Sequence, residues 1–306
     1  MSFNENAQLD TSSIGSGGGG GGRGGMVVGG GIVGLIIAIL TMLLGGDPSQ
    51  IPGTTTQQDT SGAQSIDGSA IQQQCQTGAD ANEFVECRIV GTVNSAEAYW
   101  SEELARYGKQ FREPQTIIYS QATQSGCGTA SNQVGPFYCP LDEGIYIDAS
   151  FFDILEQQFG SDDGPLAQEY VVAHEYGHHI QNVLGLLGRA QQDPQGATSG
   201  AVRIELMADC FAGMWARAAS STQDAQGNTF LKPLTESDIR SALSAASAVG
   251  DDRIQEKTQG RVTPESWTHG SAEARQRWFI AGMEAGDDIN KCNTFAVDDP
   301  NSEIVN

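Results

Sequence analysis

Three of the four histidines in this chain lie between positions 174 and 179, and this cluster constrains the fold more than any other feature. His174 and His178 are four residues apart, so on an α-helix both side chains leave the same face on neighbouring turns. Two imidazoles in that arrangement can bind one Zn²⁺ at ~2.0–2.1 Å each. Glu175 points about 100° away from His174, beside the metal, which suits a general base acting on a metal-activated water. The pattern predicts a zinc site, and a non-catalytic metal site stays open because spacing does not reveal a free coordination position.

A zinc hydrolase needs a third protein ligand, and the segment 201–219 offers two acidic residues at helical spacing. Glu205 and Asp209 are four residues apart in an otherwise apolar stretch. Because a charged group on a buried helix face is costly unless it is paired or binds a metal, we predict Glu205 as the third ligand. Asp209 is predicted to accept a hydrogen bond from the far ring nitrogen of a ligand histidine. The alternative is a solvated face paired with Arg203.

The two remaining histidines have less defined roles. His179 points about 100° away from His178, so a hydrogen-bonded structural role is expected for it. His269 is a candidate donor to the oxyanion that forms when water attacks a carbonyl, and Tyr146 is another. For His269, a structural or helix-capping role before the segment 271–285 is the alternative.

Hydrophobic periodicity predicts a mainly helical domain with a small β-sheet. Between residues 94 and 113, apolar residues recur at three- and four-residue steps, and Pro114 ends the run. Further helices are predicted over 151–159, 166–187, 201–219, 236–248 and 271–285, and strands over 116–119 and 144–148.

The N-terminal part of the chain predicts a membrane anchor. Residues 1–25 are polar and glycine-rich and are not expected to contribute to a core. Residues 26–44 carry no charged side chain and are long enough for one transmembrane helix. A cleaved signal peptide or a buried helix is the alternative. A flexible linker over 45–75 then leads to a domain over 76–306.

The charge distribution and the cysteines predict on which side of the membrane the domain lies. Arg23 is the only basic residue before the span, which predicts a cytoplasmic N-terminal tail and an extracytoplasmic domain. The formal net charge of -22 excludes an electrostatic nucleic-acid partner. All six cysteines follow the span, where an oxidising compartment would permit disulfides. Of fifteen connectivities, the local pairs Cys75/Cys87 and Cys127/Cys139 leave Cys210 with Cys292. Free thiols are the alternative.

These motifs together resemble the bacterial "putative neutral zinc metallopeptidase" family, single-pass membrane proteins with gluzincin-like sites. The stretches that carry the resemblance are Gly126–Gly128, Gly135–Pro140, the strand near Tyr146, Ser150–Phe152, Ala173–Gln181, Glu205–Cys210, Gly250–Asp252, Thr268–Gly270 and Arg277–Phe279.

The resemblance implies a zincin-like α+β fold, in which a small sheet covers the active-site helix and a later helix carries the glutamate ligand. It also implies the bridges Cys127–Cys139 and Cys210–Cys292. The expected protein is a zinc peptidase of the bacterial inner membrane, with one Zn²⁺ and a peptide or protein substrate. Two alternatives remain: a non-catalytic, zinc-stabilised envelope scaffold and an amidase acting on cell-wall peptides.

Overall fold

The computed structural model describes residues 1–16, 64–65, 68–131 and 134–305 of the chain. The strands there are β1 (Ile14–Ser16), β2 (Gln64–Ser65), β3 (Gln115–Ser120), β4 (Ala122–Ser125), β5 (Gly128–Ser131), β6 (Phe137–Cys139) and β7 (Gly144–Asp148). The α-helices are α2 (Gly68–Gln74), α3 (Gly78–Glu83), α4 (Val85–Arg106), α5 (Phe151–Phe159), α6 (Pro165–Val183), α7 (Gly188–Gln192), α8 (Gly200–Ala218), α9 (Glu236–Ala248), α10 (Asp251–Gln259) and α11 (Ala272–Glu284). Short 3₁₀ helices follow at η2 (Pro264–Ser266), η3 (Ile289–Cys292) and η4 (Thr294–Ala296).

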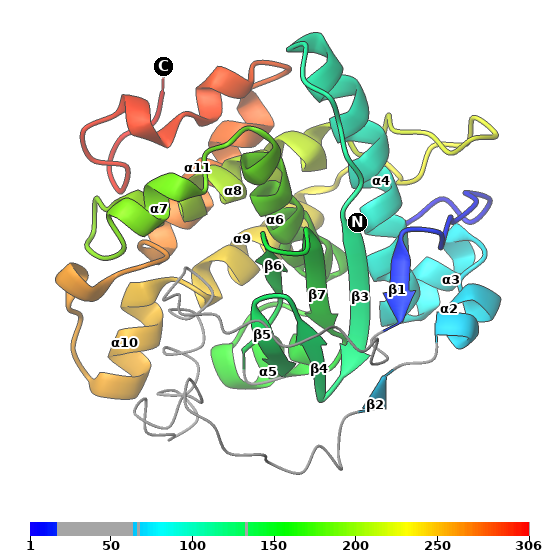
Figure 1. Ribbon diagram of the computed structural model, residues 1–306, viewed down its shortest axis with the longest axis horizontal. Coiled ribbons are helices and arrows are strands. Elements are labelled where there is room, and N and C mark those ends of the chain that lie inside the picture. The colour runs from blue at the N-terminus through cyan, green and yellow to red at the C-terminus, as the bar shows by residue number, and fades with distance from the viewer. Residues whose placement is uncertain (17–63, 66–67, 132–133, 306) are drawn as a thin grey trace.

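The main sheet separates two apolar clusters. Its strands lie in the order β1, β3, β7, β6, with β2 also paired to β3 (Figure 1). β3 runs parallel to β1 and β7, and the edge strand β6 runs antiparallel to β7. Because side chains alternate along a strand, Ile145 and Ile147 of β7 pack with the helices, while Tyr146 packs with Ile117 and Tyr119 on the other face. The hairpin β4–β5 contributes to that second cluster through Ala130.

Helix α6 lies at the centre of the helical layer, between α4 on one side and α8 and α11 on the other (Figure 1). It packs against α4, α8 and α9, and α8 packs in turn against α11. Large aromatic side chains fill the spaces between these helices, and Trp100, Trp215 and Trp278 are almost completely buried. The centre of α6 is therefore held on several sides by other helices.

Residues 1–16 belong to the folded core, which corrects the expectation that residues 1–25 contribute nothing to one. Met1, Phe3 and Ala7 are completely buried. Asn82 of α3 accepts a hydrogen bond from the Phe3 amide and donates one to its carbonyl, at 2.8 and 3.0 Å. β1 satisfies its backbone groups by pairing with the edge of β3. This order depends on partners distant in sequence, which a local pattern of polar and glycine residues does not reveal.

Most predicted elements agree with the structure to within a few residues. The predicted segments 144–148, 151–159 and 236–248 match β7, α5 and α9. Helix α4 begins at Val85 rather than near residue 94, and Gly91 in its early turns packs against the Phe3 ring. The segment 126–140, for which no element was predicted, contains β5 and β6, and the polar helix α10 was not predicted either.

All six cysteines form disulfides, which confirms the predicted pairing. The bonds are Cys75–Cys87, Cys127–Cys139 and Cys210–Cys292. The third joins α8 to η3 across 82 residues of sequence and so ties the helix that carries Glu205 to the C-terminal segment.

The membrane-related predictions are corrected. No helix in the described ranges is long and apolar enough to span a membrane. The longest ones, α4, α6 and α8, carry charged side chains and supply the core of the domain. The predicted span 26–44 lies outside the described residues, as do the boundaries at 25 and 45. The fold class with a preceding transmembrane helix and the inner-membrane localisation are therefore wrong by this finding, and the described fold is a mixture of helices and small sheets.

Candidate metal centre

Helix α6 presents the two histidines of the predicted zinc motif on one buried face. The helix begins at Pro165, whose fixed φ and missing N–H suit the first helical position. The ring centroids of His174 and His178 are 4.8 Å apart, and the residues are only 6% and 7% exposed. Such burial of two imidazoles calls for polar partners around them.

Helix α8 supplies the third member of the group because it approaches α6 very closely. A Cβ atom at Gly177 would lie 3.1 Å from both Cα and the carbonyl oxygen of Ala208, so the glycine lets the two backbones meet. Ser199 caps α8 by accepting a hydrogen bond from the Val202 amide. Glu205 is thereby placed over the histidine face of α6, and ligand atoms of His174, His178 and Glu205 all lie within 4.8 Å of one another.

The distances within this group fit a tetrahedral zinc ion. Two donors that each lie ~2.0–2.1 Å from such an ion are about 3.3–3.4 Å apart. The Nε2 atom of His174 lies 3.2 Å from Oε2 of Glu205, and Nε2 of His178 lies 3.5 Å from Oε1. Oε1 is buried and has no hydrogen-bond partner among the described residues, which is costly unless a ligand takes its place. The three residues are therefore compatible with a single zinc ion.

Asp209 accepts a hydrogen bond from His174, the arrangement predicted for it, and it is itself held by two further side chains. Nδ1 of His174 lies 2.8 Å from Oδ1 of Asp209. Arg275 of α11 donates from Nε to Oδ2 at 2.8 Å and from Nη2 to Oδ1 at 2.9 Å, and the Tyr170 hydroxyl also donates to Oδ1. Burial would raise the pKa of Asp209, but the charges of Arg275 and His174 lower it below its usual value. Asp209 is therefore an ionised acceptor that fixes the proton of His174 on Nδ1.

The electrostatic field at the group favours a cation. Burial opposes protonation of His174, but the charge of Asp209 and hydrogen bonds with Asp209 and Glu205 raise its pKa to about 9. Burial likewise opposes ionisation of Glu205, but the charge of His178 and the hydrogen bond with His174 hold its pKa well below the usual value. Surroundings that stabilise a proton on an imidazole nitrogen also stabilise a metal ion at the same position.

His178 is held differently, by an amide on its own helix. Its Nδ1 atom lies 2.8 Å from Oε1 of Gln181, and Nε2 of Gln181 donates to the carbonyl of Ile204 at 2.6 Å. Gln181 is completely buried. Both histidines of the group thus have a hydrogen-bond partner at Nδ1, which leaves Nε2 directed at Glu205.

Arg275, Tyr170 and Gln181 were not assigned a role from the sequence. A signal for Arg275 exists, because it precedes the buried Trp278 and Phe279 by three and four residues and so shares their helix face. A cation on that face needs an acidic partner, which in the structure is Asp209. The close packing of α8 on α11 brings them together, since a Cβ atom at Gly213 would lie 2.0 Å from the carbonyl oxygen of Phe279.

Glu175 lies beside the group and is free to accept a proton. It is 7% exposed, and its carboxylate makes no hydrogen bond within the described part of the chain. Burial raises the pKa of Glu175, and the charges of His178 and His174 act against that rise. A carboxylate with a raised pKa next to a cation site has the properties of a general base.

His269 is held near Glu205 by a buried carboxylate. Oδ2 of Asp251 accepts hydrogen bonds from the amides of residues 268, 269 and 270 at 2.7, 2.6 and 3.0 Å. Nδ1 of His269 lies 2.9 Å from the Thr268 hydroxyl and 3.3 Å from Oδ1 of Asp251. Burial lowers the pKa of His269, but the hydrogen bond to Asp251 and the charge of Glu205 raise it overall. His269 is not part of the three-residue metal group, and its predicted oxyanion role stays a prediction.

Two other predicted candidates are engaged elsewhere. His179 bonds to the Tyr138 hydroxyl at 3.2 Å and to the Arg112 carbonyl at 2.6 Å, which agrees with the structural role expected for it. The Tyr146 hydroxyl donates to Asp142 at 2.7 Å, on the sheet face away from the helices. Nothing in these contacts favours Tyr146 as an oxyanion donor.

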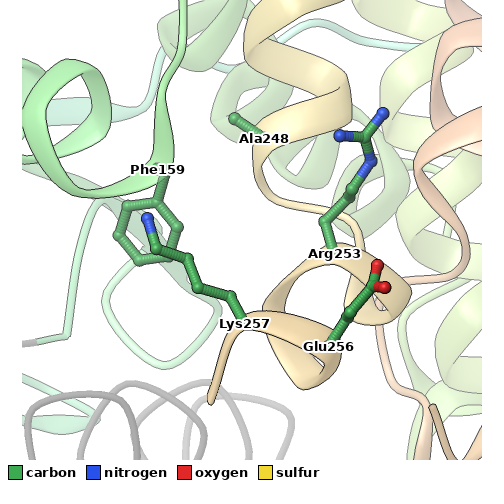
Figure 2. A pocket seen from close by; sticks show the side chains of 5 residues that line it. All are labelled: Phe159, Ala248, Arg253, Glu256 and Lys257. Atoms are coloured by element: carbon green, nitrogen blue, oxygen red, sulfur yellow. The ribbon is translucent and has the colours of Figure 1, made fainter. Parts of the chain in front are cut away.

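A cavity of about 220 Å³ opens between α5, the end of α9 and α10, and none of its lining residues belongs to the metal group. Figure 2 shows the Lys257 side chain lying across the Phe159 ring, with Arg253 and Glu256 on the same helix turning away from it. The Lys257 ammonium lies 5.9 Å from the ring centroid and also donates to the Gln158 carbonyl. The ammonium group therefore already interacts with neighbouring groups of the protein.

Comparison with known proteins gives a consistent result. A family model described as "Putative neutral zinc metallopeptidase" matches residues 4–295. An uncharacterized protein of Mycobacterium tuberculosis, Rv2575, is 53% identical over 300 residues, which are 98% of this chain and 99% of that protein. The uncharacterized protein YpfJ of Escherichia coli is 38% identical over 268 residues, 86% of each chain. No solved protein structure matches, so the zincin-like arrangement stays a prediction.

Proposed function

This chain belongs to the family described as "Putative neutral zinc metallopeptidase", and on that premise we propose that it is a zinc-dependent peptidase with Glu175 as its general base. The observation that carries the proposal is the convergence of His174, His178 and Glu205, with one buried carboxylate oxygen left without a partner. A purely structural role would not require an additional, unpaired glutamate beside that group.

In this proposal His174, His178 and Glu205 would hold one zinc ion, the histidines through Nε2 and Glu205 through a carboxylate oxygen. When bound, the ion would supply Lewis-acid chemistry that makes water a better nucleophile near neutral pH. Asp209 keeps the proton of His174 on Nδ1 at 2.8 Å, so that Nε2 presents its lone pair.

Glu175 moves the proton of the reaction. Its carboxylate takes a proton from the attacking water and transfers that proton to the leaving amine when the peptide bond breaks. The burial that raises its pKa brings its basicity closer to the operating pH, where proton transfer in both directions is efficient.

His269 is proposed to stabilise the negative charge that develops on the carbonyl oxygen. Asp251 fixes the loop through three backbone hydrogen bonds and lies 3.3 Å from Nδ1 of His269. The raised pKa of His269 favours a protonated ring whose Nε2–H can donate to an oxyanion.

The test compares the 306-residue chain with Glu175→Gln, which keeps the shape of the side chain but cannot accept a proton. Exposed Glu156 of α5 provides a matched control, Glu156→Gln. The proteins are loaded with zinc, their metal content is measured, and a broad mixture of peptides is screened for cleavage with and without a chelator.

We expect zinc-loaded wild type and Glu156→Gln to cleave peptide bonds. Glu175→Gln should bind the same amount of zinc and be slower by about 10²- to 10⁴-fold. Equal cleavage by wild type and Glu175→Gln would remove Glu175 from the mechanism. Zinc binding without cleavage of any peptide would favour the scaffold alternative, and cleavage confined to cell-wall peptides would favour an amidase.

A further inference from the structure

The two histidines of the metal group are supported by chemically different partners. Nδ1 of His174 faces the carboxylate of Asp209, which lies on another helix. Nδ1 of His178 faces the neutral amide of Gln181, three residues further along α6 and completely buried. The amide group of Gln181 can donate as well as accept, so its orientation decides which nitrogen of His178 carries the proton.

The backbone of α8 determines that orientation. The nitrogen of Gln181 lies 2.6 Å from the carbonyl oxygen of Ile204, and a carbonyl oxygen can only accept a hydrogen bond. The atom of Gln181 that faces Ile204 must therefore be the NH₂ group, which turns Oε1 towards His178. An amide oxygen can only accept, so Nδ1 of His178 must be the donor across the 2.8 Å contact.

This chain of contacts has two consequences for the metal group. Neutral His178 carries its proton on Nδ1 and keeps the Nε2 lone pair directed at the group, 3.5 Å from Oε1 of Glu205. Gln181 also connects the ligand histidine to Ile204, the residue immediately before Glu205, so one side chain aligns ligands from both helices. We propose that Gln181 is a positioning residue for the metal, which sets the tautomer of His178 and holds it in register with Glu205.

The inference rests on the proposed zinc site but not on peptide hydrolysis. If Gln181 only filled space between α6 and α8, removing its hydrogen bonds would lower stability without changing the protonation pattern of His178. A role in positioning requires that zinc affinity and the tautomer change together when both hydrogen bonds are removed. The two readings therefore differ in measurements that do not involve catalysis.

The experiment uses Gln181→Met, which keeps the length but has no comparable hydrogen-bond group, and Gln181→Glu, which keeps the acceptor for His178 but loses the donor to Ile204. Asn182→Leu is the matched control, because the side-chain amide of the neighbouring Asn182 donates to the Tyr138 hydroxyl at 2.9 Å and makes no hydrogen bond to His174, His178 or Glu205. Zinc Kd is measured by competition with a chelator. Two-bond ¹H–¹⁵N spectra of the zinc-free proteins report the tautomers of only four histidines.

In wild type we expect His178 to show the pattern of a ring protonated at Nδ1. Gln181→Met should weaken zinc Kd about 10- to 100-fold and alter the His178 nitrogen signals. Gln181→Glu should keep the His178 nitrogen signals close to wild type, because the acceptor for Nδ1–H remains, but it should weaken zinc Kd, because the hydrogen bond to Ile204 is lost. Asn182→Leu should leave both unchanged.

Three results would overturn the proposal. One is a wild-type His178 protonated at Nε2, which can be observed even if the variants do not fold. The others are an unchanged zinc Kd in Gln181→Met, and His178 nitrogen signals that change in Gln181→Glu as much as they do in Gln181→Met. Loss of peptide cleavage alone would leave the inference intact, because none of these measurements depends on it.

Discussion

Glu205 and Asp209 lie one turn apart on α8 and are both buried, yet their surroundings differ. Asp209 accepts hydrogen bonds from His174, Tyr170 and Arg275, so both of its oxygens are satisfied within the protein. Glu205 faces two imidazoles, and its Oε1 atom has no partner among the described residues. We call the group around Asp209 a closed network, because every charge in it has a partner within the protein, and such a network stabilises the fold. A buried carboxylate oxygen without a partner, as in Glu205, is instead suited to bind a ligand.

The largest effect on stability is expected from opening the closed network. Asp209→Leu leaves the buried Arg275 guanidinium without its counter-charge and should destabilise the protein by ~3–5 kcal/mol. Denaturation by urea in the presence of a chelator measures this loss without a contribution from metal binding. The double variant Asp209→Leu/Arg275→Met removes both charges and should recover much of the loss. A double variant as unstable as the sum of both single variants would show that the two side chains do not act as a unit.

Glu205→Gln should have the opposite pair of effects, a large loss of zinc affinity and a small loss of stability. The amide keeps the shape of the side chain but removes the charge that would bind a cation. We expect zinc Kd to weaken by more than the ~10- to 100-fold typical of losing a supporting hydrogen-bond partner. The chelator-treated variant should lose less stability than Asp209→Leu. Zinc binding that survives Glu205→Gln unchanged would contradict the distinction between the two acids.

The pH dependence of the zinc-free protein offers a third test. Since the pKa of His174 is raised to about 9 from an unfolded value near 6.5, protonated His174 stabilises the fold fully below pH ~6.5. That contribution is lost as the pH rises through about 9. The free energy of unfolding, measured at intervals from pH 6.5 to 9, should therefore fall. Asp209→Asn, which removes the main charge that raises this pKa, should flatten the slope, and an unchanged slope would exclude His174 as its source.

The convergence of His174, His178 and Glu205 could be predicted from the sequence because the helix faces that carry them are encoded locally. His174 and His178 share a helix, as do Glu205 and Asp209, and four-residue spacing places each pair on one face. That these two helices lie against each other was inferred from one further premise, that a zinc site needs a third protein ligand. The supporting contacts were harder to predict, because Arg275 is 66 residues from Asp209 and is brought to it by the packing of α11 on α8.

The same reasoning explains the failures in the fold. Residues 1–16 have no strong local preference and become ordered through β1 pairing with β3 and through burial of Phe3 against Gly91. The anchor over 26–44 was inferred from local composition alone, and no helix in the structurally described ranges can span a membrane. Elements with a strong local pattern could be predicted from the sequence. Segments such as residues 1–16, which become ordered only through partners distant in sequence, could not.

The smallest effect, and the finest test of the comparison, concerns Tyr170. Its hydroxyl donates to Oδ1 of Asp209, and Nη2 of Arg275 lies 3.2 Å from the same hydroxyl. Tyr170→Phe deletes these contacts and leaves the ion pair in place, so the zinc-free protein should lose about 1–2 kcal/mol. Zinc Kd should change far less than in Glu205→Gln, because the hydrogen bond between His174 and Asp209 remains.

Tyr176→Phe is the matched control, since the Tyr176 hydroxyl is buried on the same helix but has no hydrogen-bond partner in the described residues. It should be neutral or slightly stabilising, because it removes an unsatisfied group. If Tyr170→Phe and Tyr176→Phe had equal effects on stability, the Tyr170 hydroxyl would not belong to the closed network. The contrast between the two acids of α8 would then rest on Arg275 and His174 alone.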